Sequence, residues 1–155
     1  MKRKLIIILF VIFLIILGFF REFVFVNINT LIYNNKFNEN YPYNSFFNSI
    51  DSFHFKSLYF AKWFLTAFFI YFFYFLQIRF SWFLFYEKKF KNWIFYLYSF
   101  LVMLSIITFL IGWLFNDLRQ GYTFSRLFLG FLQSPLPTVF LTPVCYFYKK
   151  NISYF

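Results

Sequence analysis

An uninterrupted apolar run from Leu5 to Phe20 is the feature that most constrains what this chain can form. With an extension through Phe25, it is long enough for a transmembrane helix of about 20 residues. A secretory signal also begins with basic residues and an apolar run, but no small-x-small cleavage site follows this one. We therefore interpret residues 5–25 as an uncleaved first transmembrane helix.

The composition indicates a membrane protein throughout. Apolar residues make up 62% of the 155 residues, charged residues make up 13%, and the mean hydropathy is +0.65. A soluble domain has about 45–50% apolar and about 25% charged residues, and a disordered chain has low hydrophobicity. An ordinary water-soluble enzyme and intrinsic disorder are both excluded. The single cysteine excludes an intramolecular disulfide and a CxxC metal site.

Three further apolar spans are predicted at residues 58–83, 93–115 and 124–148. Trp63 and Trp82 are 19 residues apart, and Trp93 and Trp113 are 20 apart. Tryptophan prefers membrane interfaces, and either interval spans about 30 Å in a helix, which is the thickness of a hydrocarbon core. These four tryptophans are therefore predicted to be interface anchors.

Residues 27–56 are of a different kind, because they hold eight of the chain's asparagines together with Pro42, Asp51 and His54. Asparagine and proline favour turns over long regular elements. We predict an outer loop rich in asparagine and aromatic residues between the first two helices, with room for short helices.

The basic residues test the topology, because cytoplasmic segments carry an excess of lysine and arginine. With the N-terminus inside, every inner segment holds a basic cluster, and the outer loop and the outer turn at residues 116–122 do not. We expect one polytopic domain over residues 1–155, a four-helix bundle with both termini inside. The inner clusters are Lys2, Arg3 and Lys4, then Lys88, Lys89 and Lys91, then Lys149 and Lys150. This arrangement also accounts for the net charge of +10 and predicts membrane lipids, not nucleic acid, as partners.

Catalytic chemistry is not indicated. On this topology Cys145 lies near the inner face and His54 in the outer loop, too far apart to share a proton. His54 and Asp51 are an incomplete metal-ligand set. None of the carboxylates lies deep in a span, which is where a proton relay would need one. The sequence predicts a protein that is not an enzyme and has no cofactor and no metal site.

The fourth span is the polar and irregular one. Arg126, Gly130 and Gln133 share a helix face, and Pro135 and Pro143 interrupt the helix. One interpretation is a docking surface, in which the glycine permits close helix approach and the glutamine bonds a partner helix. The other is an interfacial arginine on a kinked helix that its own neighbours seal.

This segment resembles a known family. Arg126-Leu127-Phe128-Leu129, Gln133-Ser134-Pro135-Leu136, Pro143 and Tyr146-Phe147-Tyr148-Lys149-Lys150 are similar to the end of small exosortase-associated membrane proteins of the exosortase F type. Arg21-Glu22-Phe23 followed by Asn27 resembles a related group beside exosortase X. The resemblance implies a non-catalytic accessory in the bacterial inner membrane, acting beside the protease-transpeptidase that processes C-terminal sorting signals of exported proteins.

Two other functions are weighed against this one. The phenylalanine and tyrosine excess, with few carboxylates, is also typical of a hydrophobic respiratory subunit encoded by an AT-rich organelle, which would place the chain in the mitochondrial inner membrane. A small channel or transporter is the third, although such proteins generally carry polar or charged residues inside the membrane.

Overall fold

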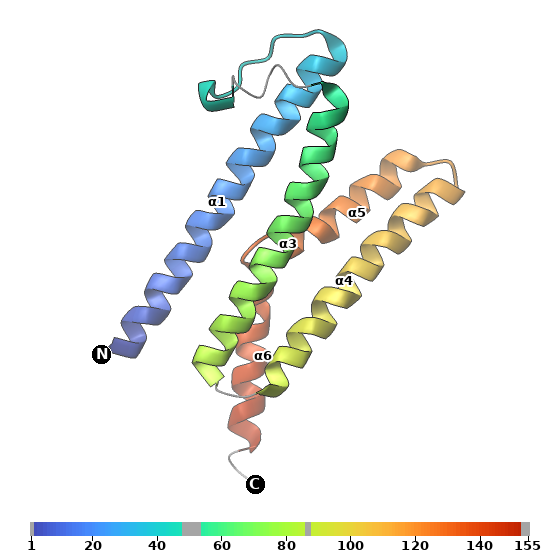
Figure 1. The fold of residues 1–155 in the computed structure, drawn as a ribbon. Coiled ribbons are helices and arrows are strands. Elements are labelled where there is room, and N and C mark those ends of the chain that lie inside the picture. Colours follow the sequence, from blue (N-terminus) through green and yellow to red (C-terminus); the bar gives the residue numbers. More distant parts are fainter. Residues whose placement is uncertain (1, 48–53, 86–87, 153–155) are drawn as a thin grey trace. The chain divides into compact units, whose positions relative to one another are not determined.

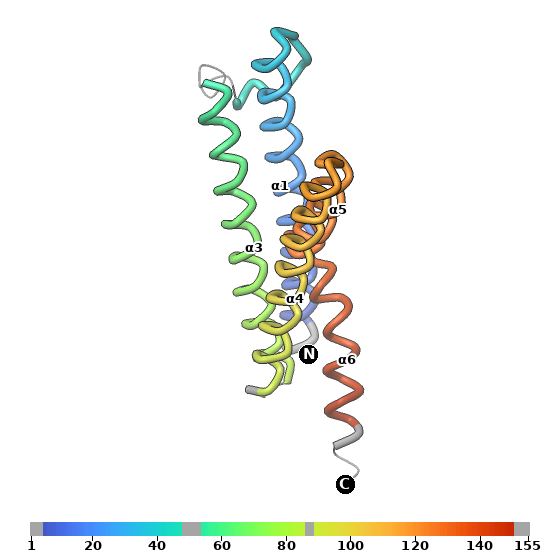
Figure 2. The backbone as a smooth tube through the Cα atoms, turned by 90° about the vertical axis from the view of Figure 1, so that its right-hand side faces the viewer, coloured from blue at the N-terminus to red at the C-terminus, as the bar shows by residue number. Residues whose placement is uncertain are grey.

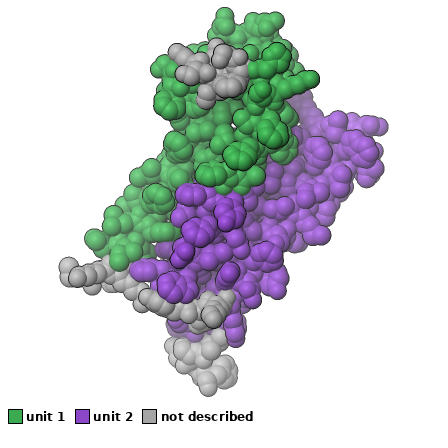
Figure 3. All heavy atoms as spheres, in the orientation of Figure 1, with its two compact units in different colours: residues 1–69 green, residues 70–155 purple. Residues whose placement is uncertain are grey.

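The computed structural model describes residues 2–47, 54–85 and 88–152, and this part of the chain is almost entirely helical, with no strand (Figure 1). The chain divides into two compact units, Met1–Phe69 and Ile70–Phe155 (Figure 3). The elements are α1 (Lys2–Phe37), η1 (Ser45–Phe47), α3 (Phe55–Phe85), α4 (Lys88–Leu114), α5 (Leu118–Leu132) and α6 (Leu136–Ile152).

Helices α1, α3 and α4 are each long and apolar enough to cross a membrane. Helices α5 and α6 meet the same requirement only as a pair, which bends by 59° at the break between them. The all-helical class is confirmed for the described residues, in which three helices, or four if the bent pair counts as one, have the length and hydropathy to span a membrane. The spans predicted at 58–83 and 93–115 differ from α3 and α4 by five residues or fewer at each end.

The predicted end of the first helix near Phe25 is wrong, because α1 continues to Phe37 and includes the first part of the predicted loop. The reason is that asparagine side chains here bond within the helix instead of ending it. Asn27 Nδ2 donates to the Phe23 carbonyl at 2.8 Å, and Asn35 Nδ2 donates to the Leu31 carbonyl at 3.1 Å.

Two asparagines of α1, Asn27 and Asn34, bind the segment that follows the helix. Asn27 Oδ1 accepts from the Asn44 backbone N–H at 2.8 Å. Asn34 exchanges two hydrogen bonds with Tyr41, because its Oδ1 accepts from the Tyr41 N–H at 3.0 Å and its Nδ2 donates to the Tyr41 carbonyl at 2.9 Å. Both amides are buried. They supply partners that an irregular backbone segment otherwise lacks.

The end of α1 is set by a different asparagine. Asn38 has φ of 53°, in the left-handed region that asparagine adopts more readily than most residues. Asn116, just after α4, has φ of 55° and a similar role. The loop proper therefore begins at residue 38, and residues 48–53, which include the predicted Asp51, lie outside the described residues.

The core of the first unit is small and lies at the loop end of its helices. Ile28 and Leu31 of α1 pack with Phe47 of η1 and Leu58 of α3. Most side chains of the Leu5–Phe20 run are exposed, as expected of a segment that faces lipid.

In the second unit, α5 folds back beside α4 (Figures 1 and 2). The two helices cross where Gly112 meets Gly121, since a Cβ on Gly112 would lie 2.5 Å from the Gly121 Cα. The Ser105 and Ser125 hydroxyls share a buried hydrogen bond of 2.7 Å further along the contact. The turn is closed by Asp117, whose N–H donates to the Gly112 carbonyl at 2.9 Å and whose Oδ1 accepts from the Gln120 N–H at 3.1 Å. The predicted turn at 116–122 is too long, because this cap starts α5 at Leu118.

Two apolar clusters complete the second unit. Ile94 and Tyr98 of α4 pack with Leu132 at the end of α5. Phe85, Phe90 and Cys145 form the other cluster, with Trp93 and Tyr148 against it. Rings in this second cluster meet edge to face, for example Phe85 and Phe90 with centroids 5.0 Å apart.

We expect Gly121→Ala to destabilise the protein by about 1–3 kcal/mol, because the new methyl group must push α5 away from α4. The measurement is the midpoint of thermal unfolding, followed by circular dichroism in a mild detergent. Gly18→Ala in α1 is the matched control, since it brings the same gain in helix propensity without the crossing. Equal midpoints for the two variants would contradict the close contact.

Candidate functional site

The predicted docking residues do not lie on one surface. Arg126 is exposed, Gly130 is half-buried, and Gln133 is 2% exposed at the C-terminal cap of α5. The three residues do not share an exposed face as expected, because α5 ends at Leu132 and the Gln133 side chain at its C-terminal cap is buried. Arg126 and Gly130 remain available to a partner, and their docking role stays a prediction.

The structure instead defines a polar stripe on α5 that the sequence analysis did not identify. Arg119, Thr123, Arg126 and Gly130 follow the i, i+4, i+7, i+11 spacing of one helix face. The first three are exposed, and the Thr123 hydroxyl donates to the Arg119 carbonyl at 2.8 Å. The buried residues of α5 (Gly121, Ser125 and Leu132) lie on the opposite side of the helix. We call the four residues the α5 polar stripe.

The prolines have three different roles. Pro135 lies in the break between the helices. Pro137 lies in the first turn of α6, where a backbone N–H has no hydrogen-bond partner within the helix, so its absence costs no bond. Pro143 lies inside α6, so the predicted interruption at this residue is wrong. Ser134 bridges the break, because its hydroxyl donates to the Phe131 carbonyl at 2.7 Å and accepts from the Leu136 N–H at 3.3 Å.

A small polar cavity lies inside the second unit, and the sequence analysis missed it. Gln77 and Ser81 of α3 line it together with Thr138, Thr142 and Cys145 of α6. Its volume is about 10 Å³, room for about one water molecule. The signal in the sequence was the pairing of polar residues four apart on two apolar helices, 77 with 81 and 138 with 142.

Some polar atoms at this cavity are unpaired. Both ends of the Gln77 amide and the Ser81 hydroxyl are buried and have no hydrogen-bond partner among the described residues. Thr142 differs, since its hydroxyl donates to the Thr138 carbonyl at 2.6 Å. A buried amide or hydroxyl without a partner costs about 1–3 kcal/mol. These groups can hydrogen-bond one molecule of about the size of water.

The predicted anchors take up several environments. Trp63, Trp82 and Trp113 are exposed, as are Lys89, Lys91, Lys149 and Lys150. Trp93 is half-buried, with its ring centroid 4.8 Å from that of Tyr148. Lys149 Nζ donates to the carbonyl of Phe85, the last residue of α3, at 3.0 Å, which is a favourable place for a cation. The side chains of Lys2, Arg3, Lys4 and Lys88 lie outside the described part of the structure.

The residues considered for catalysis belong to different units of the chain. Cys145 is buried in the second unit, and His54 is exposed in the first. Within the described ranges, no three His, Cys, Asp or Glu residues lie close enough together to hold a metal ion.

In the exposed loop, a hydrogen bond to Glu39 and the negative charge of that residue raise the pKa of Tyr41.

We expect Gln77→Met to raise the stability by about 1 kcal/mol, because it keeps the side-chain volume and removes two unpaired buried polar atoms. The thermal midpoint in detergent measures this. Gln120→Met, at an exposed position of α5, controls for the change in residue type. A lower midpoint for Gln77→Met alone would mean that the amide binds a group in the cavity.

No family model, curated protein or solved structure matches the chain. The resemblance to exosortase-associated proteins stays an expectation from the quoted residues of α1, α5 and α6.

Proposed function

We propose that this protein is a non-catalytic membrane accessory that docks to a partner through the α5 polar stripe. The observation that carries the proposal is the stripe itself. It places two exposed arginines on the side of α5 that faces away from α4, within a helix pair that has the length and hydropathy of a membrane span. Arg126 lies eight residues into α5, and an arginine inside a membrane is costly without a partner, by up to about 2.5–3.5 kcal/mol at the helix centre.

A partner helix with polar or acidic side chains would remove that penalty. The half-buried Gly130 at one end of the stripe adds room for close backbone approach. Following the resemblance of residues 126–150, we propose that the partner belongs to an exosortase-type protein-sorting system of the bacterial inner membrane.

For the topology we propose that α5 and α6 together form one broken span and that both termini are inside. The support is the placement of basic clusters at 2–4, 88–91 and 149–150, each beyond an apolar run. A re-entrant pair would instead return the C-terminus to the side of the 115–117 turn.

This topology predicts that a C-terminal fusion to a cytoplasmic fluorescent protein is fluorescent in a bacterial host. We expect a C-terminal fusion to periplasm-dependent alkaline phosphatase to be inactive in the same host. A phosphatase fused between residues 115 and 117 is the internal control and is expected to be active. Active phosphatase at the C-terminus would mean that α5 and α6 form a re-entrant loop.

For the docking function, we expect Arg119→Gln/Arg126→Gln to lower the partner recovered from native membranes by about tenfold or more. The reason is that each lost charge-assisted hydrogen bond is worth about 1.5–3 kcal/mol. The measurement is affinity purification in mild detergent with mass spectrometry. Lys36→Gln/Lys56→Gln is the matched control, since it removes two exposed or half-exposed charges from the first unit.

The identity of the recovered proteins decides the rest. Exosortase or proteins bearing sorting signals would support the proposal. Recovery of respiratory subunits would overturn the sorting function, and a homo-oligomer without other proteins would favour the channel. Equal recovery by the stripe variant and the control would overturn the docking surface.

A further inference from the structure

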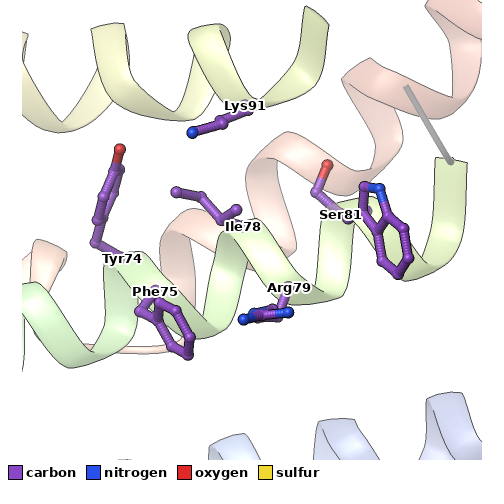
Figure 4. Close-up of a pocket in the computed structure, with 7 residues that line it drawn as sticks. Tyr74, Phe75, Ile78, Arg79, Ser81 and Lys91 are labelled. Carbon is purple, nitrogen blue, oxygen red and sulfur yellow. The ribbon is translucent and has the colours of Figure 1, made fainter. Parts of the chain in front are cut away.

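A second site lies in the same unit as α5 but does not involve it. A groove of about 450 Å³ runs between α3 and α4, and all of its lining residues belong to the second unit (Figure 4). Tyr74, Ile78 and Ser81 point from α3 toward α4, and Lys91 extends from α4 beside them. Phe75, Arg79 and Trp82 complete the lining from α3. We call it the Arg79–Lys91 groove.

The two charged residues that line the groove are both cations. Arg79 and Lys91 come from two different helices, both side chains are exposed, and none of the seven lining residues is acidic. The Arg79 guanidinium carbon lies 4.9 Å from the centroid of the Phe75 ring, so an aromatic face supports the cation. This combination favours an anionic ligand with an apolar portion.

Ser81 is the buried polar residue of the groove lining. Ser81 is 9% exposed, its hydroxyl lacks a hydrogen-bond partner among the described residues, and it lines the groove. Phosphate groups favour the two cations of this groove, which can bind them by charge-assisted hydrogen bonds.

The position along the helices indicates where the ligand comes from. Arg79 lies six residues before the end of α3 and Lys91 three residues after the start of α4, so these two cations are within about 9 Å of the helix ends. Trp82 is 57% exposed at the same level, as expected of a side chain at a membrane interface. Basic pockets between transmembrane helices at such a level bind lipid head groups.

We propose that the Arg79–Lys91 groove binds one anionic phospholipid. Arg79 and Lys91 attract its anionic head group from two sides of the groove, and its chain lies against Phe75 and Ile78. Phosphatidylglycerol is the probe of choice, because its charge is on the phosphate group and its head group is small. This site is independent of the α5 polar stripe and of any partner protein.

The test is native mass spectrometry of the full chain in mild detergent, titrated with phosphatidylglycerol or phosphatidylcholine. We expect one phosphatidylglycerol to bind at least tenfold more tightly than phosphatidylcholine, and Arg79→Gln/Lys91→Gln to remove this preference. Lys89→Gln is the matched control, because Lys89 is an exposed cation of the same helix end outside the groove. Its affinity for phosphatidylglycerol is expected to stay within twofold of the unaltered protein.

Three outcomes would overturn the site. They are equal binding of the two lipids, an equal loss in Lys89→Gln, and displacement of the lipid by inorganic phosphate at a similar concentration. Should the double variant fail to fold, a second measurement replaces it. Phosphatidylglycerol with brominated chains should quench the fluorescence of the unaltered protein more than brominated phosphatidylcholine, and Trp82→Phe should abolish the difference. Quenching that Trp82→Phe leaves unchanged would place the lipid elsewhere.

Discussion

The contact between Gly112 and Gly121 is the constraint on which the second unit depends. It allows α5 to turn back against α4 at backbone distance, and that pairing decides which side of α5 is covered. In lipid, where burial of apolar surface gives little driving force between helices, close packing of small residues and hydrogen bonds take over this role. The Ser105–Ser125 bond extends the same contact, and the polar stripe faces outward because the small residues face inward.

The sequence analysis predicted the helical membrane class and located α3 and α4 well, because long apolar runs leave few other structures open. It failed where a local preference competes with the helix. Asparagine is a turn former in water, but Asn27 and Asn35 donate their side-chain N–H groups to carbonyls of their own helix. Asn38 and Asn116, with their positive φ, behave as turn formers should.

The candidate docking site was predicted only in part, because its residues were placed on a helix that ends earlier than expected. Periodicity placed Arg126 and Gln133 on one face, which holds only while the helix continues, and α5 ends at Leu132. The prolines indicated a break in the predicted helix, but their positions alone did not show which of the three lies at the break. Pro137 and Pro143 are accommodated inside α6, and Pro135 is not. The glycines of the crossing were visible in the sequence, but their meeting depends on the length of the turn between them.

The size of the side chains between the helices distinguishes the α4–α5 contact from the α3–α4 groove. Where glycine and serine meet, between α4 and α5, the backbones touch and no ligand space remains. Where aromatic side chains lie between helices, as with Tyr74 and Tyr98, whose ring centroids are 5.2 Å apart, the backbones of α3 and α4 are held further apart. Toward the ends of these helices, that spacing is not filled by protein, and the groove opens beside Arg79 and Lys91. The proposed lipid site therefore lies where large aromatic side chains come between two helices, and its two cations lie where the lipid's phosphate would bind.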